Sequence, residues 1–170
     1  MPVPYPAIPA PVADWKAMPR IETKEEGDIV RVVGEGFQVE FNRASGTMTS
    51  LVYGGVETIA GGEGPRLNLY RAPVDNDKWF MPRLVDVGLD APAFTPRSVQ
   101  MTRLEDNVVR VDTVVDSLGL ECGFSHAASY TIFGDGSIHA ENAVSPIGAP
   151  PHPARLGVLF AMPRAFDTFT

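Results

Sequence analysis

The residues best suited to chemistry are two carboxylates, Asp75 and Asp77, which flank Asn76 in the stretch from Leu67 to Gly88. If they lie on one side of an extended backbone, their carboxylates are roughly 6–7 Å apart, because alternate residues share a face. That separation suits the paired carboxylates of a glycosidase, and it could also bind a divalent cation. A plainer interpretation is a turn whose side-chain oxygens cap backbone N–H groups at the end of a strand.

Charged and aromatic side chains flank this turn. Arg71 precedes it, and Pro73 fixes its own φ and biases the residue before it towards an extended conformation. Lys78, Trp79 and Phe80 follow directly. Aromatic rings can stack on sugar faces, although they more often serve a core or an interface. A strand that leads into a polar turn is typical of a ligand-facing loop on a rigid scaffold.

The segments that must position this loop are predicted to be β-strands. Residues 37–41 alternate strictly between apolar and polar types, the pattern of a half-buried strand. Further strands are predicted over residues 29–33, 47–53, 56–59, 98–104, 108–115, 121–133, 137–144 and 154–162. We expect only one short helical turn, over residues 79–86. The fold class is therefore predicted to be all-β, an antiparallel β-sandwich.

The beginning of the chain differs in composition from the remainder. Six prolines occupy the first 20 residues and favour an extended, polyproline-like conformation. A charged cluster over residues 22–28 follows, and we expect it to be solvated. We therefore predict a Pro-rich extended linker over residues 1–26 and one β-sandwich domain over residues 27–170.

Composition excludes several classes of partner. Acidic residues outnumber basic ones by 21 to 14, which gives a net charge of −7. Nucleic acids and anionic membranes bind basic surfaces, so neither is an expected partner. No apolar run approaches the roughly 20 residues of a membrane span. No signal peptide is visible at the N-terminus, and both the cytoplasm and the periplasm stay open as compartments.

Cysteine and histidine usage limits the chemistry further. Cys122 is the single cysteine, so no internal disulfide forms, and its strand-like surroundings predict a buried, inert thiol. The three histidines, His126, His139 and His152, lack the spacing of zinc ligands. A Gly-x-Ser-x-Gly nucleophile elbow is also absent from the sequence.

Four segments resemble a known family. The motif RAPVDND, from Arg71 to Asp77, is similar to the Arg-Ala-Pro-x-Asp-Asn-Asp signature in the C-terminal domain of bacterial β-galactosidases of glycoside hydrolase family two. Residues 37–46 look like the opening hairpin of that domain, and residues 130–138 look like its central hairpin. Residues 151–157 resemble the Leu-Pro-Arg-x-Gly segment. The likeness covers about residues 27–165, in the order of the family.

The resemblance implies a supersandwich, similar to galactose mutarotase, that lies against a catalytic (β/α)₈ barrel. The barrel carries both glutamates of the retaining reaction, so this chain is expected to be an accessory domain fragment that has no catalytic residue of its own. It would form the rim of the sugar pocket, with the matched residues Arg71, Asp75, Asn76 and Asp77, and, by position, Lys78 and Trp79. Magnesium and sodium ions of such enzymes are bound mainly by the barrel, and no cofactor is expected in this chain.

The implied partners are the remainder of a β-galactosidase chain and its β-galactoside substrate. The chain lacks the Gly-x-Gly-Pro-x-Glu-Asn-Tyr segment of the family, so we expect a domain truncated at its C-terminal end. The open strand edges of such a piece could support a homo-oligomer.

The alternative is a stand-alone carbohydrate-binding module or a mutarotase-like enzyme. A mutarotase requires a histidine acid and a glutamate base in one cleft, for which His126 and Glu141 are the candidate pair.

Overall fold

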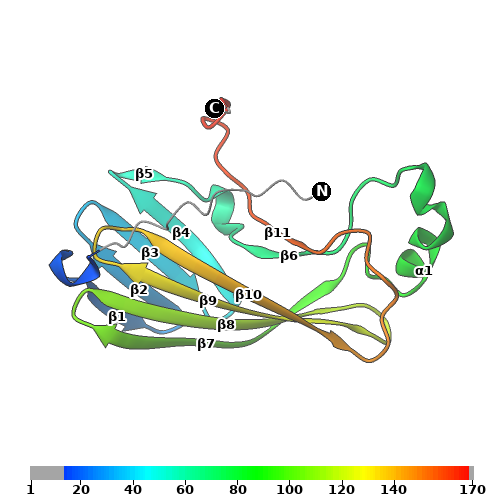
Figure 1. Cartoon of the computed structure of the whole chain (residues 1–170), viewed down its shortest axis with the longest axis horizontal. Helices are drawn as coiled ribbons and strands as arrows, with labels where there is room; N and C mark the ends of the chain where they lie inside the picture. The colour runs from blue at the N-terminus through cyan, green and yellow to red at the C-terminus, as the bar shows by residue number, and fades with distance from the viewer. Residues whose placement is uncertain (1–13, 169–170) are drawn as a thin grey trace, which may run out of the picture.

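The computed structural model describes residues 14–168, which fold into three antiparallel sheets (Figure 1). A five-stranded sheet has the order β1-β2-β3-β4-β5, a four-stranded sheet has the order β10-β9-β8-β7, and β11 pairs with β6. The strands are β1 (Glu22–Glu26), β2 (Ile29–Gly34), β3 (Phe37–Asn42), β4 (Thr47–Tyr53), β5 (Val56–Glu57), β6 (Arg66–Asn68), β7 (Ala93–Glu105), β8 (Val108–Leu118), β9 (Gly123–Phe133), β10 (Ile138–Ile147) and β11 (Gly157–Leu159). The predicted all-β, antiparallel sandwich is confirmed.

The main core lies between the two larger sheets. Alternate residues of β3 are buried, with Phe37, Val39 and Phe41 facing the four-stranded sheet. From the opposite sheet, Tyr130 packs its ring against Phe41, with ring centroids 5.3 Å apart. Strict alternation in sequence thus predicted a half-buried strand correctly, because successive side chains of a strand point to opposite faces.

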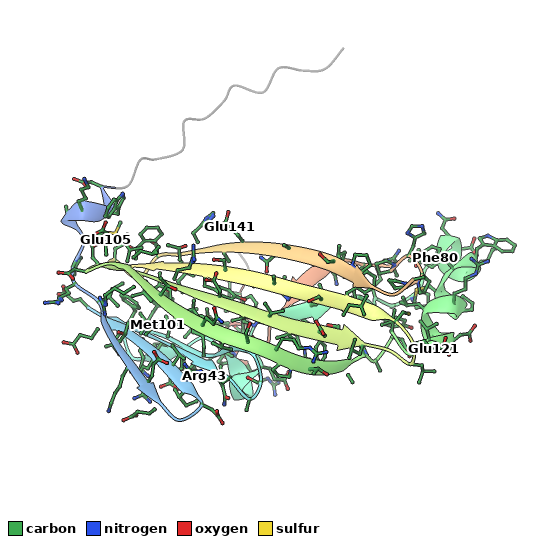
Figure 2. All side chains as sticks on the ribbon, turned by 90° about the horizontal axis from the view of Figure 1, so that it is seen from below. Arg43, Phe80, Met101, Glu105, Glu121 and Glu141 are labelled. Atoms are coloured by element: carbon green, nitrogen blue, oxygen red, sulfur yellow. The ribbon has the colours of Figure 1, made fainter. Side chains whose placement is uncertain are left out.

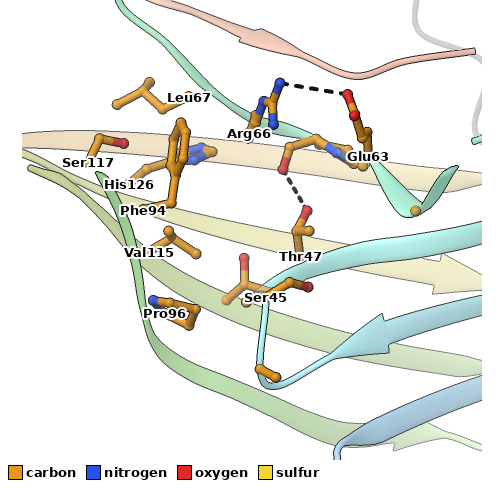
Figure 3. A pocket seen from close by; sticks show the side chains of 16 residues that line it. Ser45, Thr47, Glu63, Arg66, Leu67, Phe94, Pro96, Val115, Ser117 and His126 are labelled. Carbon is orange, nitrogen blue, oxygen red and sulfur yellow. Dashed lines mark hydrogen bonds and ion pairs between the residues drawn. The ribbon is translucent and has the colours of Figure 1, made fainter. Parts of the chain in front are cut away.

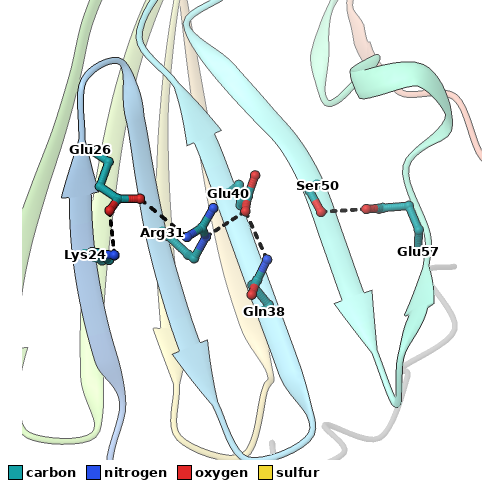
Figure 4. A network of polar contacts seen from close by, with 7 residues as sticks. All are labelled: Lys24, Glu26, Arg31, Gln38, Glu40, Ser50 and Glu57. Carbon is teal, nitrogen blue, oxygen red and sulfur yellow. Dashed lines mark hydrogen bonds and ion pairs between the residues drawn. The ribbon is translucent and has the colours of Figure 1, made fainter.

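The outer face of the five-stranded sheet carries a network of ion pairs and hydrogen bonds (Figure 4). Arg31 donates from Nε to Glu40 Oε1 at 2.7 Å, and its guanidinium lies 3.7 Å from Glu26. Gln38 donates to the same oxygen of Glu40 at 3.0 Å. Solvent screens surface pairs of this kind, so they contribute little to stability. The network marks the solvated face of the sheet.

A second apolar cluster lies at the far end of the four-stranded sheet, where α1 (Met81–Asp86) packs (Figures 1 and 2). Its buried members are Leu67, Leu69, Met81, Leu84, Leu89, Cys122 and Phe124. Cys122 is a buried free thiol, as predicted. This cluster carries the segment from residue 71 to residue 79 at the end of the molecule opposite η1 (Trp15–Ala17).

Several element boundaries differ from the predictions. Residues 22–26, assigned to the linker, form β1 and pair with β2. This edge strand is mostly exposed, so its charged residues gave no strand pattern. The strand predicted over residues 154–162 shrinks to β11, and β8 continues to residue 118, beyond its predicted end at residue 115. The linker residues before Asp14 lie outside the described residues.

Candidate functional site

The residues from Arg71 to Trp79, here called the 71–79 loop, do not continue the extended backbone. Residues Asp75–Trp79 form the 3₁₀ helix η3 instead. A 3₁₀ helix has three residues per turn, so Asp75 and Asp77 point in different directions. The prediction that Asp75 and Asp77 lie on one side of an extended strand is therefore wrong.

Within this loop, the side chain of Asp77 is buried and binds Arg71 through both carboxylate oxygens. Arg71 Nη2 donates to Oδ1 at 2.9 Å, and Nη1 lies 2.7 Å from Oδ2. The backbone N–H of Val74 also donates to Oδ2, at 2.8 Å. Only 4% of the Asp77 side chain is exposed. A two-pronged guanidinium–carboxylate contact fixes both distance and orientation. Asp77 therefore closes the loop on itself, which supports the interpretation as a capped turn.

The other polar and aromatic side chains of the loop face solvent. Asp75 is 89% exposed, Trp79 is 78% exposed, and Asn76 is exposed as well. Lys78 Nζ lies 3.4 Å from Asp75 Oδ1 and 5.5 Å from the centre of the Trp79 ring. The six predicted site residues thus fall into two groups. Arg71 and Asp77 bind each other within the loop, whereas the remaining four face solvent.

The loop does not fit paired-carboxylate catalysis or cation binding. Both oxygens of Asp77 are already engaged, which leaves Asp75 as a lone exposed carboxylate. Hard cations require several convergent oxygen ligands. Within residues 14–168, no group of three or more His, Cys, Asp or Glu side chains is arranged to hold a metal ion. The loop therefore presents one exposed carboxylate rather than a pair.

The short helix α1 anchors the loop. Met81 and Leu84 are buried in the second apolar cluster, and Pro82 occupies the first turn, where its missing N–H costs no hydrogen bond. The helix is followed by Gly88, whose φ of 74° suits the left-handed residue that often terminates a helix. This packing places the exposed Trp79 on a fixed base.

His126 and Glu141, the candidate mutarotase pair, lie on opposite faces of the four-stranded sheet. His126 belongs to the inward row of β9, and its Nε2–H donates a hydrogen bond to Asn142 Oδ1 at 2.9 Å. Because Asn142 reaches this face, its neighbour Glu141 points to the other one. Glu141 is exposed and lies 3.9 Å from His139. The two groups do not converge in a cleft.

The sequence did not single out two buried polar residues of β8, Thr113 and Ser117. Both line a cavity of about 240 Å³ to which the 71–79 loop contributes no residue. The sequence does show two hydroxyl side chains in a strand that is otherwise rich in valine. They can be recognised as cavity residues only when the inward face of β8 is known.

No helix in the described part of the chain is both long enough and apolar enough to cross a membrane.

Comparison with known proteins places these features in a family. Residues 33–170 match the family model described as beta galactosidase small chain. The chain is also 28% identical over 160 residues to a beta-galactosidase of Priestia megaterium (strain DSM 319 / IMG 1521). That alignment covers 91% of this chain but 15% of the relative, so the chain spans a small part of the length of the protein it matches. The chain belongs to the β-galactosidase small-chain family.

Proposed function

We propose that the chain acts as an accessory domain of a larger retaining β-galactosidase, which hydrolyses terminal β-D-galactosides with two glutamates located outside this chain. Three observations support the proposal. The family match covers most of the chain, the relative is a beta-galactosidase of much greater length, and the 71–79 loop lacks a usable carboxylate pair.

In the proposed enzyme, the 71–79 loop forms part of the rim of the sugar pocket. The observation that carries this role is the contact between half-buried Arg71 and buried Asp77, which closes the loop that carries the exposed Trp79. Contact residues on a rigid support lose little conformational entropy when they bind, so more of the contact energy appears as affinity. Asp75 and Asn76 can exchange hydrogen bonds with sugar hydroxyls, and the Trp79 ring offers a flat apolar face.

The remainder of the enzyme also covers the segment around β11 in this proposal. Val158 and Leu159 are adjacent in the strand, so they point to opposite faces, yet each is almost half exposed. A strand that is apolar on both faces is typical of burial on both sides. The exposed apolar residues of this segment are Leu156, Val158, Leu159, Phe160 and Met162. Backbone amides of β11 should exchange hydrogen more slowly in the intact enzyme than in the chain alone.

Replacement of Trp79 in the intact enzyme tests the rim role. Trp79→Ala should raise KM for a galactoside about two- to tenfold, because an aromatic contact contributes about 0.5–1.5 kcal/mol. The value of kcat should change less, since a rim contact acts on the bound substrate and the transition state alike. A KM that stays at the wild-type value would assign Trp79 to a contact with protein.

Trp15→Ala is a matched control for this experiment. Trp15 lies at the opposite end of the molecule, and a lysine, Lys16, lies 5.5 Å from its ring centre, as Lys78 does at Trp79. Loss of a similar lysine–tryptophan contact there should leave both kinetic constants unchanged. An equal rise of KM in both variants would indicate a general loss of stability.

A further inference from the structure

Polar residues interrupt the inward rows of β8 and β9 at one place. In β8 the inward residues Val109 and Val111 are followed by Thr113 and Ser117, and in β9 the corresponding polar residue is His126. Thr113, Ser117 and His126 are 4%, 0% and 5% exposed. A buried polar group costs free energy unless it is hydrogen-bonded. Each of the three polar groups in this part of the core is therefore expected to have a hydrogen-bond partner.

These three residues line the cavity of about 240 Å³, here called the His126 cavity (Figure 3). The four-stranded sheet forms one wall, and the segments 44–47 and 62–67 form the other. Thr47 Oγ1 donates to the Pro65 carbonyl oxygen at 2.6 Å and ties these two segments together. Gly46 adopts φ 71° and packs so closely on the sheet that a Cβ would lie 2.6 Å from Val115 Cγ2. The walls are therefore fixed in place.

Ser117 places a buried hydroxyl without a hydrogen-bond partner at the cavity. Among the described residues it is the buried side-chain oxygen or nitrogen for which no hydrogen bond is found. His126, in contrast, is bonded to Asn142 at 2.9 Å. An unpaired buried hydroxyl in a native fold calls for a specific reason, such as a bound molecule.

The lining indicates the chemistry of that molecule. At about 30 Å³ for each water, the cavity has room for roughly eight waters, which is the scale of a small organic molecule. Arg66 and Glu63 lie 3.7 Å apart at the cavity and offset each other's charge. Arg66 also lies 5.6 Å from the ring centre of Phe94, which supplies an apolar wall. Hydroxyl groups, an aromatic wall and balanced charge suit a neutral, hydroxyl-rich ligand.

We propose that the His126 cavity is a binding site for a small neutral polyol, separate from the 71–79 loop. Ser117 and Thr113 exchange hydrogen bonds with ligand hydroxyls, and Phe94 covers the apolar face of the ligand. The chemistry is shared by monosaccharides and by linear polyols. This proposal does not depend on the role of the chain in a β-galactosidase.

Titration of the ¹⁵N-labelled 170-residue chain, followed by amide chemical shifts, tests the proposal. The probes are D-galactose, D-glucose and glycerol, and inorganic phosphate serves as a charged control. Saturable shifts at Thr113, Ser117 and His126 are expected with at least one neutral probe and not with phosphate. A response to the hexoses alone would identify a monosaccharide site, whereas a response to glycerol would identify a site for linear polyols.

Two variants assign the binding to the cavity. Ser117→Ala and Thr113→Val should each weaken binding at least tenfold while the chain stays folded by circular dichroism. Ser129→Ala is the matched control, since Ser129 lies on the outward face of β9 and should leave the affinity unchanged. The proposal would be overturned by a lack of saturable shifts in the wild-type chain, or by equal affinity in the wild-type, Ser117→Ala and Thr113→Val chains.

Discussion

Arg71 grips both carboxylate oxygens of Asp77, at 2.9 Å from Oδ1 and 2.7 Å from Oδ2. This single contact separates the residues that support the 71–79 loop from those that face outward. It also removes Asp77 from any role as a free acid, base or cation ligand. The contact therefore fixes the shape of the loop that carries the outward-facing residues.

Removal of one charge from this pair should destabilise the fold. Asp77→Asn keeps the shape of the side chain but replaces one acceptor oxygen with a donor that faces Arg71. We expect the free energy of unfolding in urea to fall by about 1–3 kcal/mol, the cost of a partly unsatisfied buried group. Asp75→Asn is the matched control, and its effect should stay within about 0.5 kcal/mol because Asp75 is exposed. Equal effects of the two changes would contradict the supporting role of Asp77.

Stability should decline at alkaline pH because of Tyr130. Burial raises the pKa of Tyr130 from 10.0 to about 12. Between these values the unfolded chain loses the phenol proton while the folded chain keeps it. The stability is thus complete below about pH 10 and falls as the pH rises towards 12, by up to about 1.4 kcal/mol per pH unit. Tyr130→Phe should remove this part of the decline in urea unfolding. Parallel curves for the two proteins would show that Tyr130 does not titrate in this way.

The close approach of two segments depends on a glycine. A Cβ at Gly64 would collide with the carbonyl oxygen of Met48, a backbone atom that cannot easily move away. Gly64→Ala should therefore lower the free energy of unfolding by about 1–3 kcal/mol, as overpacking does elsewhere. At Gly157 the nearest atom would be 3.9 Å away, so Gly157→Ala should change stability by about 0.5 kcal/mol or less. A thermal melt of both variants measures the difference.

The sequence predicted the strands well where alternation encodes burial. The alternation of Phe37, Val39 and Phe41 reports which side of β3 faces the core. The charged strand β1 was missed because it pairs through backbone groups at an exposed edge, which leaves no pattern in side-chain type.

The candidate site was harder to predict because its geometry depends on contacts between side chains. The extended form of the segment after Pro73 was plausible from local preference alone. The turn into η3 depends on the Arg71–Asp77 pair and on the burial of Met81. In the same way, the register between β9 and β10 decides which face of the sheet His126 and Glu141 point to, and residue types alone do not give that register.

Hydrolysis of a chromogenic β-D-galactoside by the purified 170-residue chain tests the central claim most directly. The chain is proposed to contribute contact residues to a site whose catalytic glutamates lie elsewhere. The account predicts no release of chromophore above the buffer rate, in the wild-type chain and in Asp75→Ala alike. Hydrolysis that copurifies with the folded chain and disappears in Asp75→Ala would contradict it.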